Sequence, residues 1–252
     1  KIAGCKNLAS KYKDFLNREI KKYFRTLYDP QTWLVKLEWF STPKDVIVRR
    51  GACVANVFMI YLQKLLLEDY PFLINPFGKR DLLTPFVKAY WLEREGYFRN
   101  DVEDGGGFLS ADANIFPFWL GILENRRMHK RAIDAIRREG LDKPFPLKFH
   151  SFLNLAWVHW GSRIMTPNYQ GNSIWPYFAP VYIRQLHQFY PEEAIKHLQT
   201  YLTLIEKYRA FVEVFEPDGK SPLKGKFGHS AETGLLWAAT VPPLVEKLAI
   251  IA

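Results

Sequence analysis

Apolar residues recur at steps of three and four along most of this chain, a spacing that predicts amphipathic helices. Such repeats predict helices at residues 7–26, 52–68, 81–95, 110–123, 127–139, 178–189, 191–208 and 231–250. Residues 31–40 fit either a helix or a strand, and residues 151–160 form a short apolar stretch. The pattern therefore predicts a mostly helical protein with hardly any strand.

Proline, glycine and capping residues indicate where several of these helices begin and end. Ser110 precedes an apolar run and suits an N-cap, whereas Gly140 follows a polar-faced helix and suits its end. Asn125 marks a short turn into the helix at 127–139, and Pro191 begins the helix at 191–208. The pair Pro242-Pro243 predicts a kink or break in the last helix.

The predicted helices are joined by loops of two kinds. Short plain turns, such as the one at Asn125, contrast with long loops rich in Gly, Pro, Trp, Asn and acidic residues, chiefly 96–107 and 168–177. In a ring of antiparallel helical hairpins, the long loops would all lie on one face. We therefore expect an all-α fold, an (α/α) toroid of helical hairpins, formed by a single domain over residues 1–252.

Charge and composition restrict the partners. The net charge is +9, but Lys and Arg alternate with acids along the predicted helices, and the dense cluster at 126–131 fits the polar face of one helix. No nucleic-acid recognition motif accompanies the charge, so we expect no nucleic-acid partner. Aromatic residues are 16% of the chain, a surplus typical of proteins that line a ligand cleft with rings.

The same survey predicts no membrane partner and no cofactor. No apolar run reaches the roughly 18 residues of a membrane span, and the N-terminus lacks the apolar core of a signal peptide, which favours the cytoplasm. The two cysteines, Cys5 and Cys53, are far apart, and no His, Asp and Glu spacing is typical of a metal site.

The most suggestive carboxylate is Glu213, in the segment Phe211-Val-Glu-Val-Phe-Glu-Pro-Asp-Gly219. Pro217 fixes φ and Gly219 accepts a positive φ, so this turn ends regular structure abruptly. A carboxylate held there among apolar neighbours suits acid–base chemistry if it faces a cleft. A solvated Glu on an edge strand is the alternative.

The segment Gly171-Asn-Ser-Ile-Trp-Pro176, followed by an apolar helix, resembles a stretch of the six-hairpin, (α/α)6-toroid glycosidases. This group includes the glycogen-debranching glucosidases, the trehalases and the processing-type α-glucosidases and mannosidases. In debranching-like members, a Glu-x-aromatic segment and then a Trp-rich last helix follow, as residues 211–219 and Leu236-Trp-Ala-Ala239 do here. Residues 49–56, 97–101 and 110–114 are also similar to stretches of these enzymes, and the order of the motifs carries the resemblance.

The resemblance implies an inverting glycoside hydrolase that cleaves α-glucosidic or related α-glycosidic bonds of an oligosaccharide or polysaccharide. Glu213 would be its general base, drawing a proton from the attacking water. A full toroid has twelve helices and this chain predicts fewer, so we expect a fragment that lacks an N-terminal portion.

The general acid has no clean counterpart in this sequence. Glu38-Trp-Phe-Ser-Thr-Pro-Lys-Asp45 occupies the place of the family's Trp-Met-Asp segment, with Ser41 where an Asp is expected. Asp45 is the nearest acid, and Asp101, Asp104 and Asp112 are alternatives on the predicted loop face. Asp112 also fits a structural role, because an Asp in a first helical turn complements the helix dipole.

Several residues are candidates for binding the sugar. Tyr169 and Trp175 could stack on it, because Asn168, Gln170 and Asn172 beside them offer amide hydrogen bonds to hydroxyl groups. The other candidates are Trp39, Trp119, Arg49 or Arg50, His229 and Asp101. Each has a structural alternative: a core ring, a surface salt bridge, a helix cap or a solvated turn.

Two functions stay open at this point. The first is the glycosidase. The second is a non-catalytic helical-hairpin protein that binds carbohydrate or serves as a scaffold and has lost the acid. Ser41 favours the second, whereas Glu213 and the 171–176 segment favour the first.

Overall fold

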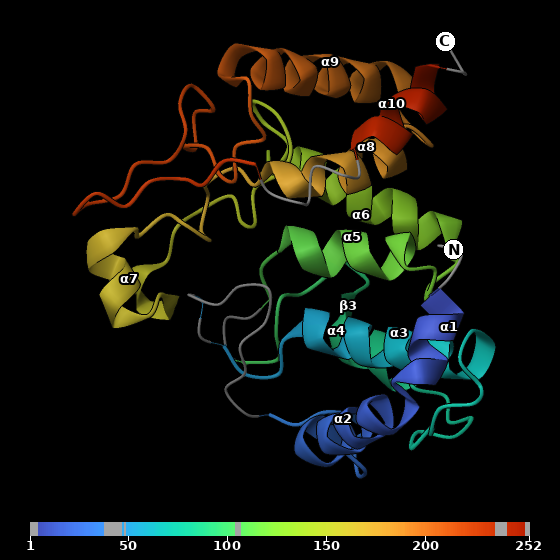
Figure 1. The fold of residues 1–252 in the computed structure, drawn as a ribbon. Coiled ribbons are helices and arrows are strands. Elements are labelled where there is room, and N and C mark those ends of the chain that lie inside the picture. Colours follow the sequence, from blue (N-terminus) through green and yellow to red (C-terminus); the bar gives the residue numbers. More distant parts are fainter. Residues whose placement is uncertain (1–4, 38–46, 48, 104–106, 235–240, 250–252) are drawn as a thin grey trace.

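The computed structural model describes residues 5–37, 47, 49–103, 107–234 and 241–249 and is mainly helical (Figure 1). Its α-helices are α1 (Cys5–Lys11), α2 (Lys13–Leu27), α3 (Cys53–Glu68), α4 (Leu83–Tyr90), α5 (Ala111–Trp119), α6 (Arg126–Arg138), α7 (Trp160–Met165), α8 (Ala179–Leu186), α9 (Pro191–Tyr208) and α10 (Val241–Ala249). Two 3-10 helices span Leu155–Trp157 and Pro176–Phe178. Two small antiparallel sheets pair β1 (Tyr28–Asp29) with β2 (Leu34–Val35) and β3 (Trp91–Leu92) with β4 (Tyr97–Phe98). The prediction of a mainly helical protein is confirmed.

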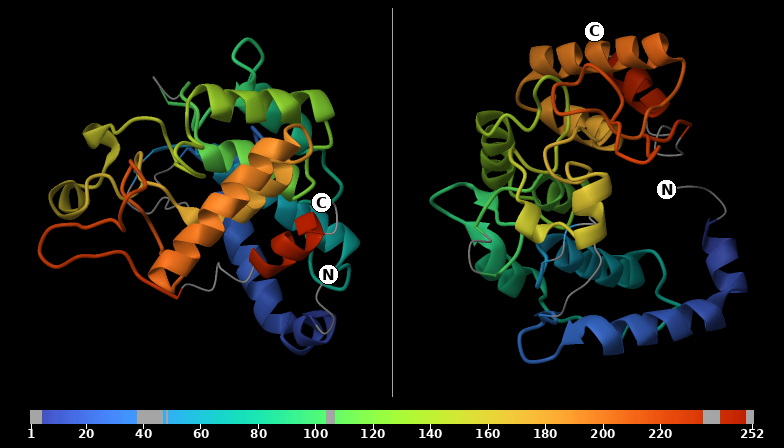
Figure 2. Two further views of the ribbon diagram at one scale, coloured as in Figure 1. Left: turned by 90° about the horizontal axis from the view of Figure 1, so that it is seen from above. Right: turned by 90° about the vertical axis from the view of Figure 1, so that its left-hand side faces the viewer.

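The helices form a stack with α2 at one end and α9 at the other, as Figures 1 and 2 show. Helix α5 lies in the middle and packs against α3, α6 and α8, and α8 packs against α9. One apolar core runs through the stack, from Ile20 of α2 to Tyr201 of α9. A smaller cluster of Phe145, Ile174, Val212 and Phe215 lies under the loops at one side.

Side-chain patterns explain which helices are central. Every residue of α5 from Ala111 to Pro117 is buried, including the polar Asp112 and Asn114, as expected for a mainly apolar helix at the centre of a stack. Helix α6 buries Ala132, Ile133 and Ile136 and exposes most of its Lys and Arg side chains. The basic cluster at 126–131 therefore does belong to the polar face of one amphipathic helix.

Two of the predicted helix ends are confirmed in detail. The side chain of Asn125 accepts a hydrogen bond of 3.0 Å from the backbone N–H of Met128 and caps α6. Gly140 follows that helix with φ of 68°. Ser110 occupies the N-cap position of α5, but its hydroxyl donates to the carboxylate of Asp112 instead of accepting from the backbone.

Other predicted boundaries are wrong. The helix expected at 7–26 is interrupted at Tyr12, and the helix expected at 81–95 ends at Tyr90, where the β3–β4 hairpin begins. Of residues 31–40, only the short strand Leu34–Val35 is regular, and 38–40 lie outside the described residues.

The last helix begins ten residues later than expected, at Val241 instead of Ala231. Thr233 pairs with Val212 in an antiparallel bridge, so residues 231–233 are extended. Pro242 and Pro243 lie in the first turn of α10, where a missing N–H costs no hydrogen bond. Residues 235–240, which include Trp237, lie outside the described residues.

Candidate functional site

Several predicted site residues meet where short extended segments lie side by side at one edge of the helical stack. Ile174 and Phe215 exchange two backbone hydrogen bonds of 3.0 and 2.8 Å. Similar backbone bonds join the segments in the order 109–111, 147–150, 171–175, 212–216 and 222–223. The start of α5 and the segment of Glu213 therefore belong to the same row of paired segments, although about 100 residues of sequence separate them.

Both carboxylate oxygens of Glu213 are held by hydrogen bonds. The Tyr169 hydroxyl donates to Oε1 at 2.6 Å, and the backbone N–H of Glu232 donates to Oε2 at 3.1 Å. The backbone N–H of Glu213 donates in turn to the carbonyl oxygen of Glu232 at 2.9 Å. The side chain is half-buried, and a carboxylate has about four acceptor positions, so it can accept further donors.

Tyr169 is itself positioned by aromatic neighbours. The indole N–H of Trp175 donates to the carbonyl oxygen of Tyr169 at 2.6 Å, and the two rings meet edge to face with centroids 4.7 Å apart. His229 lies on the other side, with its ring centroid 5.9 Å from that of Tyr169. Trp175 is buried, so in this structure its ring orients Tyr169 and is not open for stacking on a sugar.

Several buried polar atoms of residues 168–173 and of His229 lack hydrogen-bond partners among the described residues. Asn168 Oδ1, Asn172 Oδ1, Ser173 Oγ and His229 Nδ1 are buried and have no hydrogen-bond partner within the described part of the chain. Buried polar atoms nearly always have a partner in native proteins, so atoms without one indicate a place for water or a ligand. Gln170, between these residues, is also buried. Two amide oxygens, a hydroxyl and an imidazole can together accept or donate hydrogen bonds to a polyhydroxylated molecule.

Asp101 has a structural role in a second cluster. Its carboxylate is fully buried and accepts two hydrogen bonds from Arg49, of 2.9 Å from Nε and 2.8 Å from Nη2. Asn100 Nδ2 and the backbone N–H of Glu103 also donate to it, at 2.5 and 3.0 Å. The guanidinium of Arg49 lies over the ring of Trp157. Arg49 therefore pairs with the carboxylate of Asp101, and this pair is buried instead of lying on the surface.

Arg50 lies beside this pair and is exposed. Its backbone N–H donates to Glu103 Oε2 at 3.0 Å. Together with Leu37, Arg49, Val102 and Glu103 it lines a shallow depression of about 460 Å³. This depression is separate from the hydrogen bonds of Glu213.

The general acid is not identified by the described contacts. Asp112 is fully buried in the first turn of α5 and accepts a hydrogen bond from the Ser110 hydroxyl. Trp119 lies at the opposite end of that helix, away from the row of extended segments. The predictions for Trp39, Asp45 and Asp104 fall outside the described residues.

One part of the site was missed in the sequence. Residues 231–233 were expected in a helix, so the backbone of Glu232 was not recognised as a partner of Glu213. Gly225, Gly228 and Gly234 gave a usable signal, because glycines at this spacing are typical of hairpin turns. Gly228 and Gly234 do have positive φ, of 79° and 80°.

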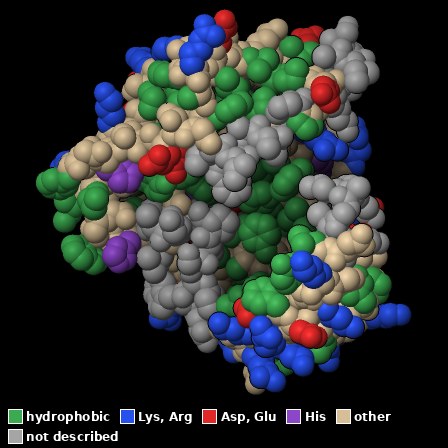
Figure 3. Space-filling model, viewed as in Figure 1, with side chains coloured by type: hydrophobic (Ala, Val, Ile, Leu, Met, Phe, Trp, Pro, Cys, Tyr) green, Lys and Arg blue, Asp and Glu red, His purple; other side chains and the backbone are tan. Residues whose placement is uncertain are grey.

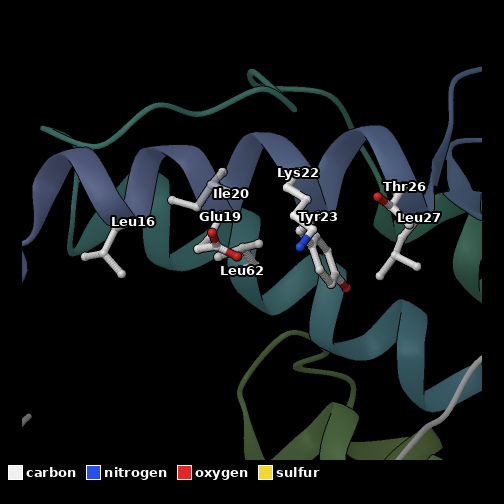
Figure 4. A pocket seen from close by; sticks show the side chains of 8 residues that line it. All are labelled: Leu16, Glu19, Ile20, Lys22, Tyr23, Thr26, Leu27 and Leu62. Atoms are coloured by element: carbon white, nitrogen blue, oxygen red, sulfur yellow. The ribbon is translucent and has the colours of Figure 1, made fainter.

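Further hollows lie elsewhere in the described part of the chain, and one of about 330 Å³ is lined by Arg137, Asp142, Lys143, Glu193, Lys196 and His197. An apolar groove of about 440 Å³ follows α2 and is lined chiefly by Leu16, Ile20, Tyr23, Leu27 and, from α3, Leu62 (Figure 4). Over the described ranges, no three His, Cys, Asp or Glu side chains are grouped so that they could hold a metal ion. No helix in that part of the chain has both the length and the apolar character needed to cross a membrane.

Comparison with known proteins adds no assignment to this geometry. No protein-family model matches the chain, and a search of curated proteins finds no similar sequence.

Proposed function

We propose that this protein is an inverting glycoside hydrolase that acts on α-glucosidic or related α-glycosidic bonds, with Glu213 as the general base. Two observations carry the proposal: Tyr169 and Glu232 hold the carboxylate of Glu213, and four buried polar atoms, on Asn168, Asn172, Ser173 and His229, lack partners in the described part of the chain. A sugar presents hydroxyl groups that both donate and accept, so it could satisfy amide oxygens, a hydroxyl and an imidazole at once. The proposed substrate is an oligosaccharide or polysaccharide, and the proposed chemistry needs no cofactor.

In this mechanism Glu213 removes a proton from a water molecule that attacks the anomeric carbon. The Tyr169 hydroxyl and the Glu232 N–H hold the carboxylate at 2.6 and 3.1 Å and leave acceptor positions for that water. A carboxylic acid on the other side of the bond gives its proton to the leaving oxygen. In inverting enzymes the two carboxyl groups are roughly 6.5–9.5 Å apart.

Asp45 is the proposed acid and Asp112 the alternative. Asp112 is on the neighbouring α5, but its carboxylate would have to exchange its contact with Ser110 for one with the substrate.

As for architecture, we propose that the stack formed by α3, α5, α6, α8 and α9 is part of an (α/α) toroid. Its support is the central, fully buried α5 with packed helices on both sides.

A second function, carbohydrate binding without hydrolysis, is favoured by two observations. Ser41 stands where the resembling enzymes have an Asp, and the carboxylate of Asp112 is engaged by Ser110. The cluster around Glu213 would then bind hydroxyl groups without activating water.

Hydrolysis of aryl and natural α-glucosides, α-mannosides and trehalose by the wild type and by Glu213→Gln tests the proposal. General-base loss is expected to lower kcat by about 10²–10⁴-fold. Glu216→Gln is the matched control, because Glu216 lies three residues further on and its carboxylate accepts from the backbone N–H of Lys224 instead of from Tyr169. Activity that survives in Glu213→Gln removes Glu213 from the mechanism. Sugar binding by an inactive wild type, measured by calorimetry, would support the second function.

A further inference from the structure

An exposed apolar surface lies on the loop side of the helical stack, and its exposed apolar residues take no part in the proposed hydrolysis. It consists of residues 152–165, which include α7, and the hairpin at 224–230, and we call it the tip surface. Trp160 is 70% exposed and Phe227 is 83% exposed, and Leu155, Ile164 and Met165 are also exposed. Figures 1 and 2 show α7 and the neighbouring hairpin projecting from the helical stack, and Figure 3 shows apolar side chains gathered at that end.

The two parts of the tip surface are tied together. The backbone N–H of Lys226 donates to the carbonyl oxygen of Met165 at 2.9 Å. Gly225 lies so close to Thr166 and to the backbone of Met165 that a Cβ added there would come within 2.4 Å of Thr166. The hairpin is therefore held against α7, and their exposed side chains form one surface.

Phe227 is held in an unfavourable backbone conformation at the end of this hairpin. Phe227 and Gly228 both have positive φ, of 58° and 79°, as in a two-residue type I′ turn. The first position of such a turn strongly favours Asn, Asp or Gly, and a bulky side chain is strained there. Within the described part of the chain the ring is 83% exposed, so packing there offsets little of this strain. Strain of this kind, kept at an exposed ring, indicates a binding function.

The charge of the tip surface indicates an anionic partner. Residues 151–167 and 219–231 contain no Asp or Glu. Arg163, Lys224 and Lys226 are exposed within these segments. Exposed apolar side chains with three cations and no acid within the same segments favour a negatively charged and partly apolar surface.

A second copy of this chain fits poorly. The apolar groove along α2 could receive the rings, but α2 itself carries Lys13, Arg18, Lys21, Lys22 and Arg25 against Asp14 and Glu19. Two tip surfaces facing each other would likewise bring cations together. Both arrangements place like charges side by side, which costs binding free energy.

We propose that the tip surface binds an anionic lipid bilayer at its headgroup layer. Trp160 and Phe227 would enter the interface, where aromatic rings are favoured, while Arg163, Lys224 and Lys226 meet lipid phosphates and carboxylates. A single-stranded nucleic acid is the weaker candidate, because Leu155, Ile164 and Met165 have no flat face on which bases could stack. Binding of this kind lies on the membrane and needs no spanning helix, so it differs from the membrane partner that the sequence excluded.

Co-sedimentation with vesicles tests the proposal. We expect the wild type to bind vesicles of phosphatidylserine and phosphatidylcholine in equal parts, and not vesicles of phosphatidylcholine alone. Added salt should weaken binding, because it screens the exposed cations. Phe227→Asn and Trp160→Ala should each lower the partition coefficient about tenfold, the loss expected for one aromatic ring. Phe227→Asn also suits the turn, so this variant should stay folded.

Trp33→Asn is the matched control. Trp33 is also an exposed ring at positive φ, of 60°, but it lies in the β1–β2 turn, outside the tip surface. This variant should bind as the wild type does, and so should Glu213→Gln, because Glu213 is not part of the tip surface. Failure of the wild type to bind the anionic vesicles overturns the proposal, as does equal loss in Trp33→Asn. Full displacement from vesicles by an equimolar single-stranded oligonucleotide would also overturn it, in favour of nucleic acid.

Discussion

Replacing Arg49 by Met should destabilise the fold strongly, because Arg49 neutralises a buried carboxylate. Asp101 is 0% exposed and the side chain of Arg49 only 11% exposed, and two hydrogen bonds of 2.9 and 2.8 Å join them. Met keeps much of the volume over Trp157 but removes the charge. Asp101 would then retain only the donors from Asn100 and the Glu103 backbone, with the carboxylate of Glu103 nearby.

The size of the effect follows from this burial. Removing one partner of a buried ion pair costs about 3–5 kcal/mol, because the other charge stays buried without compensation. That is a large part of the roughly 5–15 kcal/mol by which a domain is stable. Lys220→Met is the control, because Lys220 and Asp218 form an exposed pair of 3.8 Å. An exposed pair of this type contributes about 0–1 kcal/mol.

Urea unfolding of the two variants and the wild type measures how much free energy of unfolding each substitution removes. The double variant Arg49→Met, Asp101→Asn should lose less stability than the sum of the two single variants, because it no longer buries an isolated charge. A cost below about 1 kcal/mol for Arg49→Met, the upper range for exposed pairs, would refute the reasoning and mean that water reaches Asp101.

Two further predictions concern protonation and backbone strain. Burial lowers the pKa of His129 to about 4, and the unfolded chain takes up that proton near the ordinary pKa of about 6.5. The free energy of unfolding therefore falls by up to about 3 kcal/mol as pH falls from about 6.5 to about 4. Urea unfolding at several pH values should show this decrease, and His129→Phe should make it smaller. At Phe227, substitution by Asn should raise the free energy of unfolding by about 1 kcal/mol, because Asn tolerates the left-handed conformation; a lower thermal midpoint would contradict this reading of the turn.

The helical part of the fold could be predicted because its signals are local. The repeat that buries one side of α6, the cap at Asn125 and the stop at Gly140 are each contained in a few neighbouring residues. Residues 231–234 could not be predicted in this way. Ala231 and Glu232 favour a helix, but backbone hydrogen bonds to Phe211 and Glu213, about twenty residues away, hold the segment extended. Long-range pairing overrides local propensity in such segments.

The candidate site was predictable only in part, for a similar reason. The order of motifs connected Glu213 with residues 168–176, and the Ile174–Phe215 pairing brings these segments together. The sequence could not show that Trp175 is buried and orients Tyr169, since burial depends on what packs around the ring. Nor could the sequence show that Arg49 pairs with Asp101, because 52 positions separate the two residues.

The central claim, that Glu213 activates water for an inverting hydrolysis, is tested most directly by the anomer of the first product. Proton NMR of a freshly started reaction on an α-glucoside should show the β anomer before mutarotation, and Glu213→Gln should form neither anomer at a comparable rate. The α anomer as the first product, or an unchanged rate in Glu213→Gln, would contradict the account.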